Sequence, residues 1–173
     1  MPHVLLDQVI DTDYGQFDLI WGEGEGFAGD WDPFFAGQVN GLVGGAADDG
    51  VYISLARRSG GSQVRAVLLD GEPAGDPIWE DVVEISTTVP ENVPVRWQTW
   101  AVEESGRLDL PPATYRLRVS ARGRDAGNEG EFAEGVVDFY LLELWPSPSA
   151  PDAIIRTASE NAARWHREVG GRR

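Results

Sequence analysis

The chain has 173 residues, with 29 Asp and Glu against 14 basic residues, a net charge of −15 and no cysteine. This length suits one domain with a substantial core, and the lack of cysteine excludes a disulfide framework and thiolate metal sites. No apolar run approaches the roughly 20 residues that cross a bilayer, and the start does not resemble a secretory signal. We therefore expect a cytoplasmic protein.

The negative charge is concentrated in the N-terminal part of the chain. Residues 1–104 hold nineteen acids and four arginines, whereas residues 105–173 hold ten of each, and there is no lysine. A concentrated negative field repels nucleic acid and membrane surfaces and attracts basic partners. The charge therefore favours a basic protein partner and disfavours nucleic acid and membranes, with a general solubility surface as the alternative.

Two short apolar runs, His3–Ile10 and Gln16–Trp21, predict the first strands. Gly22–Gly50 follows without a sustained period, and its glycines and Pro33 predict a long loop with one helical turn near Phe34–Gln38. Loops of this length in a compact domain are usually functional or mobile. Its many aromatic residues either pack the loop on the core, the favoured interpretation, or present a binding surface.

The middle of the chain predicts further strands at a spacing of about ten residues, as in a β-sandwich. Val51–Ala56 and Val64–Asp70 resemble a hairpin joined by a Gly-rich turn, because the linking sequence is RRSGGSQ. Trp79–Val89 and Val95–Val102 continue the series.

The region Arg107–Trp145 predicts two central strands. In the first, Tyr115, Leu117, Val119 and Ala121 alternate with arginines and a serine, which indicates one buried and one wetter face. The second, Val136–Trp145, is apolar on both faces apart from Asp138 and Glu143, as in the interior of a sheet. Cross-strand pairing with Glu80 and Glu84 is the simplest role for the arginines.

The last part changes character. PSPSAP reads as a stiff connector, and Asp152–Val169 has a helical period with Ser149 or Asp152 as cap and Gly170-Gly171 at its end. We therefore predict an all-β fold, an antiparallel two-sheet sandwich of jelly-roll type, with a C-terminal amphipathic α-helix. Residues 1–146 would form the sandwich domain, and residues 147–173 the connector and a helix packed on the same domain.

Catalytic signatures are weak in this sequence. The two histidines, His3 and His166, lie at opposite ends of the chain, and no nucleophile elbow is present. Asp30-x-Asp32 and Asp11-x-Asp13 place hard oxygens at a loop spacing that suits calcium, but neither continues into the twelve-residue calcium loop. We expect no enzyme activity and no cofactor, and leave a metal open.

Several motifs together resemble a known family. They are Tyr14 with Gln16-Phe17, Trp31-Asp32, the strand start Gly50-Val-Tyr-Ile-Ser, the turn and strand Leu110–Leu117, and Asp138 with Tyr140. Their order is similar to that of the competence protein J family, the small acidic inhibitors of a DNA-entry nuclease, over residues 10–145. The chain departs from this pattern in residues 123–135 and after Trp145. The resemblance implies a β-sandwich that inhibits a nuclease.

These observations lead to one main hypothesis, a non-enzymatic acidic protein that inhibits or gives immunity against a basic nuclease or toxin. The alternative is a small-ligand or carbohydrate-binding sandwich, with Trp97, Trp100 or Trp31 as a stacking platform. A carboxylate-based hydrolase is a third reading. For the main hypothesis, the predicted partner-binding residues are those of the acidic loop: Glu23, Glu25, Asp30, Trp31, Asp32, Asp48 and Asp49.

Overall fold

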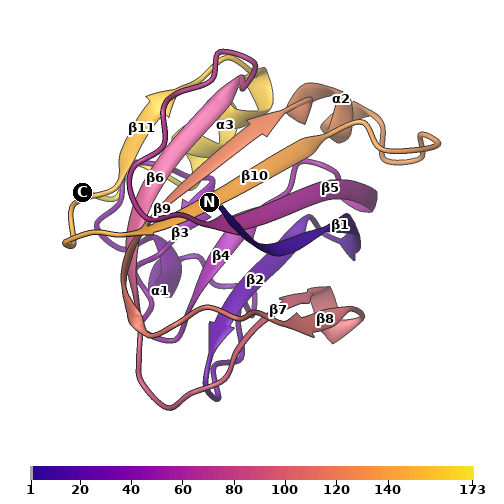
Figure 1. Ribbon diagram of the computed structural model, residues 1–173. Helices are drawn as coiled ribbons and strands as arrows, with labels where there is room; N and C mark the ends of the chain where they lie inside the picture. Colours follow the sequence, from indigo (N-terminus) through magenta and orange to yellow (C-terminus); the bar gives the residue numbers. More distant parts are fainter. Residues whose placement is uncertain (1) are drawn as a thin grey trace.

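The computed structural model describes residues 2–173 as two packed β-sheets flanked by short helices (Figure 1). Sheet A has the order β1-β5-β10-β9-β6-β11 and sheet B the order β3-β4-β2-β7-β8. All strand pairs are antiparallel except β5 and β10, which are parallel. The predicted fold class is thus confirmed.

The elements have the following bounds. Sheet A consists of β1 (His3–Asp13), β5 (Ser59–Leu68), β6 (Asp81–Val89), β9 (Ala113–Arg122), β10 (Phe139–Pro146) and β11 (Ala153–Arg156). Sheet B consists of β2 (Gln16–Trp21), β3 (Val43–Gly44), β4 (Gly50–Ser54), β7 (Val95–Thr99) and β8 (Ser105–Arg107). The helices are α1 (Asp32–Phe35), α2 (Arg124–Glu129) and α3 (Glu160–Glu168), and a 3₁₀ turn spans Trp100–Val102.

The two strands predicted to be central, β9 and β10, pair with each other in the middle of sheet A. The apolar residues of β9 lie in the core between the sheets, including Tyr115 and Leu117, which are 2% and 0% exposed. Arg116 and Arg118 lie on the other face, where both guanidinium groups bind the Glu84 carboxylate of β6 at 3.1 and 2.9 Å. The predicted cross-strand pairing therefore occurs with Glu84.

The hairpin predicted for Val51–Ala56 and Val64–Asp70 is wrong, because β4 lies in sheet B and β5 in sheet A. The chain crosses between the sheets at residues 55–58, beside the crossing from β1 to β2. At that point the Leu55 N–H donates to the Gly15 carbonyl at 2.8 Å. Gly15 has φ +65° and a Cβ there would lie 2.2 Å from the Leu55 oxygen, so glycine is required. The Gly-rich stretch is not a hairpin turn, since its second half pairs with β1.

The predicted helix Asp152–Val169 is too long. Its first part is β11, which pairs with β6 at the edge of sheet A, and α3 begins only after Ser159. The Ser159 hydroxyl caps α3 by accepting from the Ala162 N–H and donates to the Asp81 carboxylate at 2.6 Å. Asp152 instead accepts hydrogen bonds from the backbone of Val39 and Asn40. Sheet pairing thus overrides the helical period of the sequence, and neither Ser149 nor Asp152 is the cap.

Two motifs behind the family resemblance have structural roles. The Tyr115 hydroxyl donates to the Pro111 carbonyl at 2.6 Å, which ties the start of β9 to the preceding turn. The buried Asp138 carboxylate accepts from the hydroxyls of Ser62 and Tyr140, at 2.8 and 2.7 Å. Buried polar groups need such partners to avoid a desolvation cost. These motif residues therefore stabilise the fold through buried hydrogen bonds.

Candidate partner-binding surface

The acidic loop crosses the outer face of sheet B and is fixed there through its backbone. Arg96 of β7 donates to the carbonyls of Gly22 and Gly24, both at 2.7 Å. Beside it, the amide nitrogens of Gln98 and Gln16 donate to the carbonyls of Glu25 and Phe27, both at 3.1 Å. A row of outward side chains on β2 and β7 therefore holds residues 22–27 against the sheet.

The alternation of glycine and glutamate in this loop separates packing from exposure. Gly24 and Gly26 face the sheet, where an added Cβ would lie 2.7 Å from the Asp49 carbonyl and from the Asp18 carboxylate, respectively. Glu23 and Glu25 alternate with these glycines in the sequence and are exposed to solvent. The close approach of the backbone thus requires the glycines and directs both glutamates outward.

Four carboxylates line a shallow cavity of about 370 Å³, which we call the acidic cavity: Glu23, Glu25, Asp30 and Asp49. Phe34 and Ala47 contribute apolar lining between them. Within residues 2–173, none of the four carboxylates forms an ion pair. The cavity therefore carries negative charge that no ion pair among the described residues compensates.

A further carboxylate, Asp18, lies beneath the loop on β2 and is fully buried. Burial raises its pKa to about 6, against the opposing effect of hydrogen bonds from Gln16, the Phe27 backbone and Gln98. The Gln16 amide donates to its Oδ2 atom at 2.6 Å, while Oδ1 has no partner among the described residues. Asp18 is thus a buried, incompletely satisfied anion at neutral pH.

A second cavity of about 770 Å³, which we call the aromatic pocket, adjoins the acidic cavity and shares Glu25 with it. Six aromatic side chains line it: Tyr14, Phe27, Trp31, Tyr52, Trp100 and Trp165. Trp31 packs edge-on against Tyr52 and Trp165 at 69° and 84°, and Tyr14 meets Trp100 at 56°. Phe27 and Trp31 stack on each other at 25°, and the other ring pairs of the pocket meet at 44° or more, so the six side chains enclose a space.

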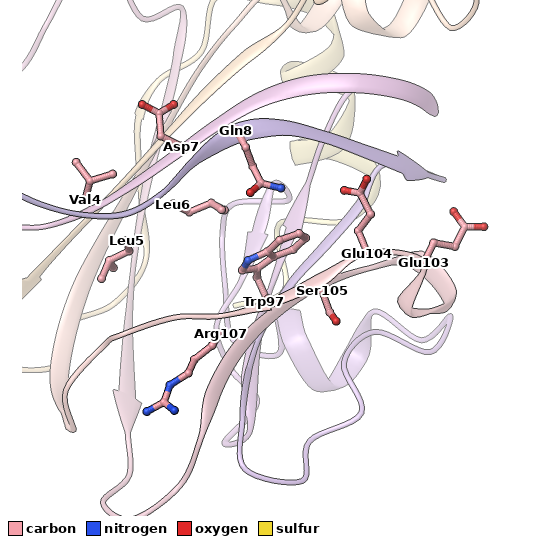
Figure 2. A pocket seen from close by; sticks show the side chains of 11 residues that line it. Val4, Leu5, Leu6, Asp7, Gln8, Trp97, Glu103, Glu104, Ser105 and Arg107 are labelled. Carbon is pink, nitrogen blue, oxygen red and sulfur yellow. The ribbon is translucent and has the colours of Figure 1, made fainter.

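A third cavity of about 910 Å³ lies between the edge strands β1 and β8, and we call it the edge groove. Figure 2 shows Trp97 between β1 and the Glu103–Arg107 segment, while Asp7 points away from Trp97. Asp7 pairs with Arg65 at 2.7 Å. Glu103 and Glu104 bring negative charge to the rim and Arg107 brings positive charge. The groove is therefore closer to electrical balance than the acidic cavity.

Comparison with solved structures finds two chains of this architecture. One is the crystal structure of ComJ from Bacillus subtilis, the inhibitor of the DNA degrading activity of NucA. It matches with a TM-score of 0.57 and 19% identity over 85% of this chain and 99% of that one. This chain is similar to ComJ in fold. The resemblance to the competence protein J family is thereby confirmed at the level of the fold.

The other match is the structure described as crocagin biosynthetic gene J, with a TM-score of 0.55 and 15% identity. It covers 86% of this chain and 99% of that chain. No family model and no curated protein matches the sequence. At these identities the comparisons establish a shared fold.

The structure brings together four of the seven predicted partner-binding residues, Glu23, Glu25, Asp30 and Asp49, in the acidic cavity. Trp31 lines the adjoining aromatic pocket. Asp32 pairs with Arg172 near the C-terminus, and Asp48 lines a different cavity beside β6. The binding role of these residues stays a prediction.

The sequence analysis missed the residues that position this surface. Arg96 and Gln98 are isolated polar residues in strands, and Gln16 was named only as part of the family resemblance. The alternation in GEGEG is a local signal of the closely held backbone but does not identify the side chains that hold it. Trp97, one of the predicted platform residues, is 5% exposed and stacks on Phe17 in the core. A flat platform that includes Trp97 is therefore excluded.

The histidines and the candidate metal ligands do not gather into a site among the described residues. His166 lies in α3 and its Nδ1 accepts from the Gly41 N–H at 3.0 Å, far in the sequence from the exposed His3. Among residues 2–173, no group of three His, Asp or Glu side chains lies close enough to hold a metal ion. No helix in this range is long and apolar enough to span a membrane.

Proposed function

We propose that this protein is a non-enzymatic acidic binding protein that neutralises a basic protein, a nuclease or a toxin. The observation that carries the proposal is the convergence of four unpaired carboxylates on a loop fixed to sheet B. The shared fold with ComJ, the inhibitor of the DNA degrading activity of NucA, supports the same class of function.

The physical basis is competition for a basic surface. A nuclease holds a polyanion in a positively charged cleft, so a rigid array of carboxylates can occupy that cleft. Long-range attraction between opposite fields accelerates encounter, while a few buried anchors supply most of the affinity. The acidic cavity supplies the field, and the loop is already ordered before binding, which lowers the entropic cost of association.

The proposal is tested by measuring binding of the full chain to NucA and to a panel of other basic nucleases, with DNA degradation as a second readout. We expect association to slow strongly between about 0.05 and 0.5 M salt, because exposed charges are screened. Binding that is insensitive to salt, or absent from the whole panel, would contradict the proposal.

A charge-matched pair of variants sharpens the test. The combination E23Q/E25Q/D30N/D49N neutralises the acidic cavity, whereas D70N/E91Q/E129Q/E134Q removes the same charge from exposed residues outside it. We expect the first combination to weaken binding by about tenfold or more and the second by much less. Equal effects would mean that net charge alone drives binding.

The alternative function, a carbohydrate-binding module, has one observation in its favour, since Trp31 and Trp100 line the same pocket. Sugars stack on flat exposed rings, whereas in this pocket Phe27 and Trp31 stack on each other at 25° and Trp31 meets Tyr52 and Trp165 at steep angles. A tryptophan fluorescence titration with monosaccharides tests it, and saturable binding would support this alternative.

A further inference from the structure

Three residues that line the aromatic pocket hold a backbone conformation that most side chains disfavour. Tyr14, Ala101 and Val102 have φ angles of 59°, 53° and 54°, in the left-handed region. A β-branched residue such as Val102 is a genuine outlier there. Such conformations persist where the surrounding structure enforces them, and they cluster at binding sites. The backbone at the rim of this pocket is therefore strained.

The polar groups beneath the pocket are arranged as acceptors. The Gln16 amide nitrogen donates to Asp18 and to the Phe27 carbonyl, and the Gln98 amide nitrogen donates to the Glu25 carbonyl. Both N–H groups of the Gln16 carboxamide and one of the Gln98 carboxamide are engaged in these bonds, so each side chain leaves its oxygen as an available acceptor. With the Glu25 carboxylate at the rim, the pocket offers oxygen atoms to a donor.

Carboxylates occur in the lining of the pocket and next to it in the chain. Glu25 connects it to the acidic cavity. Asp13 precedes Tyr14 and Glu103 follows Val102, and these two carboxylates lie close together. Desolvation and the charge of Asp13 raise the pKa of Glu103, which reports this proximity. A cation in the pocket would therefore be close to the Glu25 carboxylate and to the rim residues that adjoin Asp13 and Glu103.

We infer that the aromatic pocket receives an arginine side chain of the basic partner, stacked against its aromatic walls and hydrogen bonded to the acceptor oxygens below. The inference rests on the proposed function, because it names the anchor of the same binding surface. It adds a buried, specific contact to the long-range attraction of the acidic cavity.

Arginine fits this pocket better than other groups do. Its guanidinium carries five donors and no acceptor, is weakly hydrated and stacks on aromatic faces. The rim already holds one such contact, since the Arg58 guanidinium lies 5.2 Å from the centroid of the Tyr14 ring. An apolar ligand would leave the acceptor oxygens buried without partners, which is costly.

A small probe tests the inference without any protein partner. N-acetyl-arginine methylamide is titrated into the full chain and followed by tryptophan fluorescence and by indole N–H shifts in NMR. N-acetyl-citrulline methylamide, which has nearly the same shape without the charge, is the control. We expect weak saturable binding of the arginine probe and at least about fivefold weaker binding of the citrulline probe. Equal binding of the two, no binding, or tighter binding of glucose would overturn the inference.

Two matched pairs of variants locate the binding. Trp100→Ala removes a wall of the pocket, and Phe132→Ala removes a ring that is 92% exposed elsewhere. Glu25→Gln and Glu23→Gln change neighbouring exposed glutamates, of which only Glu25 lines the pocket. We expect Trp100→Ala and Glu25→Gln to weaken probe binding by about threefold or more, and their controls to leave it unchanged. Equal effects within a pair would overturn the inference, and unfolding curves show that each variant is folded.

The outcomes also separate this inference from the proposed function. If a basic nuclease binds Trp100→Ala as tightly as the wild type and the arginine probe does not bind, the anchor is refuted and the proposed function stands. If the arginine probe binds at the pocket but no basic nuclease binds the chain, the proposed function fails and the pocket remains a site for guanidinium groups.

Discussion

On the outer faces of both sheets, strand side chains hold overlying loops by donating to main-chain carbonyls. The two faces differ in how their buried carboxylate is paired. On sheet A, Arg116 and Arg118 hold overlying loops by donating to the carbonyls of Ala150, Pro151 and Pro73. On sheet B, Arg96 and two glutamines hold the acidic loop in the same way. On sheet A a carboxylate, Glu84, lies buried between two arginines, whereas on sheet B the buried Asp18 has only amide partners.

This difference shows which carboxylates of the chain are paired with arginine and which are not. The strand arginines of the C-terminal part compensate Glu84 on sheet A, and they leave the acidic cavity on sheet B untouched. The Glu84 carboxylate is paired on sheet A, whereas the four carboxylates of the acidic cavity form no ion pair among the described residues. The arginines of β9 therefore do not neutralise the acidic loop.

The largest effect is expected from breaking the ion pairs that join Glu84 to Arg116 and Arg118 on sheet A. Glu84→Gln leaves two nearly buried guanidinium groups facing each other, so we expect a loss of about 3 kcal/mol in the free energy of unfolding. Urea denaturation measures it. Asp7→Asn, which breaks the exposed pair with Arg65, is the control and should cost less than about 1 kcal/mol. Similar losses for both variants would contradict the contrast between buried and exposed pairs.

On sheet B the corresponding change should stabilise the protein. Because the pKa of Asp18 is raised to about 6, its contribution to stability is fully present below the unfolded pKa near 4 and is lost as the pH rises through 6. Asp18→Asn removes the cost of burying an anion, so we expect a gain of roughly 2 kcal/mol at about pH 8. The gain should vanish at about pH 3.5, where both forms are uncharged.

Urea denaturation at both pH values tests this expectation. Asp70→Asn, at an exposed carboxylate, controls for the loss of one negative charge. A variant that is less stable than the wild type at about pH 8 would mean that the ionised Asp18 is compensated within the fold.

A smaller effect is expected from releasing the acidic loop. Arg96→Met removes two hydrogen bonds to the carbonyls of Gly22 and Gly24, which should cost about 1–2 kcal/mol. Amide hydrogen exchange should accelerate in residues 22–27 while the core strands keep their protection. Arg107→Met, at the exposed register partner of Arg96, is the control. Unchanged exchange in the loop would show that Arg96 does not hold it.

Much of the sandwich could be predicted because its strands have local signatures. The alternation in Tyr115–Arg122 identified β9, its outward arginines and their cross-strand partner. The prediction failed where contacts between residues far apart in the sequence determine the structure. At residues 153–156, for example, pairing with β6 outweighs a helical period. The strand predicted to Val102 ends at Thr99, because the chain enters a strained 3₁₀ turn that no local pattern announces. Residues 123–135, for which the sequence analysis predicted no helix, contain α2.

The candidate surface was only partly predictable, for the same reason. The acidic loop was identified from its composition, but composition does not say which carboxylates converge. Asp49 joins Glu23 because the Asp49 carbonyl accepts the Trp21 N–H where the loop closes on itself. The aromatic pocket gathers residues from Tyr14 to Trp165, which only the closed sandwich brings together.

The attachment of the acidic loop has a consequence for how such a protein can change over generations. All four side-chain contacts that hold residues 22–27 end on main-chain carbonyls, so the outward glutamates carry no part of the anchoring. Substitutions at positions 23 and 25 can therefore lower or cancel the negative charge of the acidic cavity while the four anchoring hydrogen bonds stay intact. The charge that this surface presents and the contacts that hold it in place thus belong to different residues.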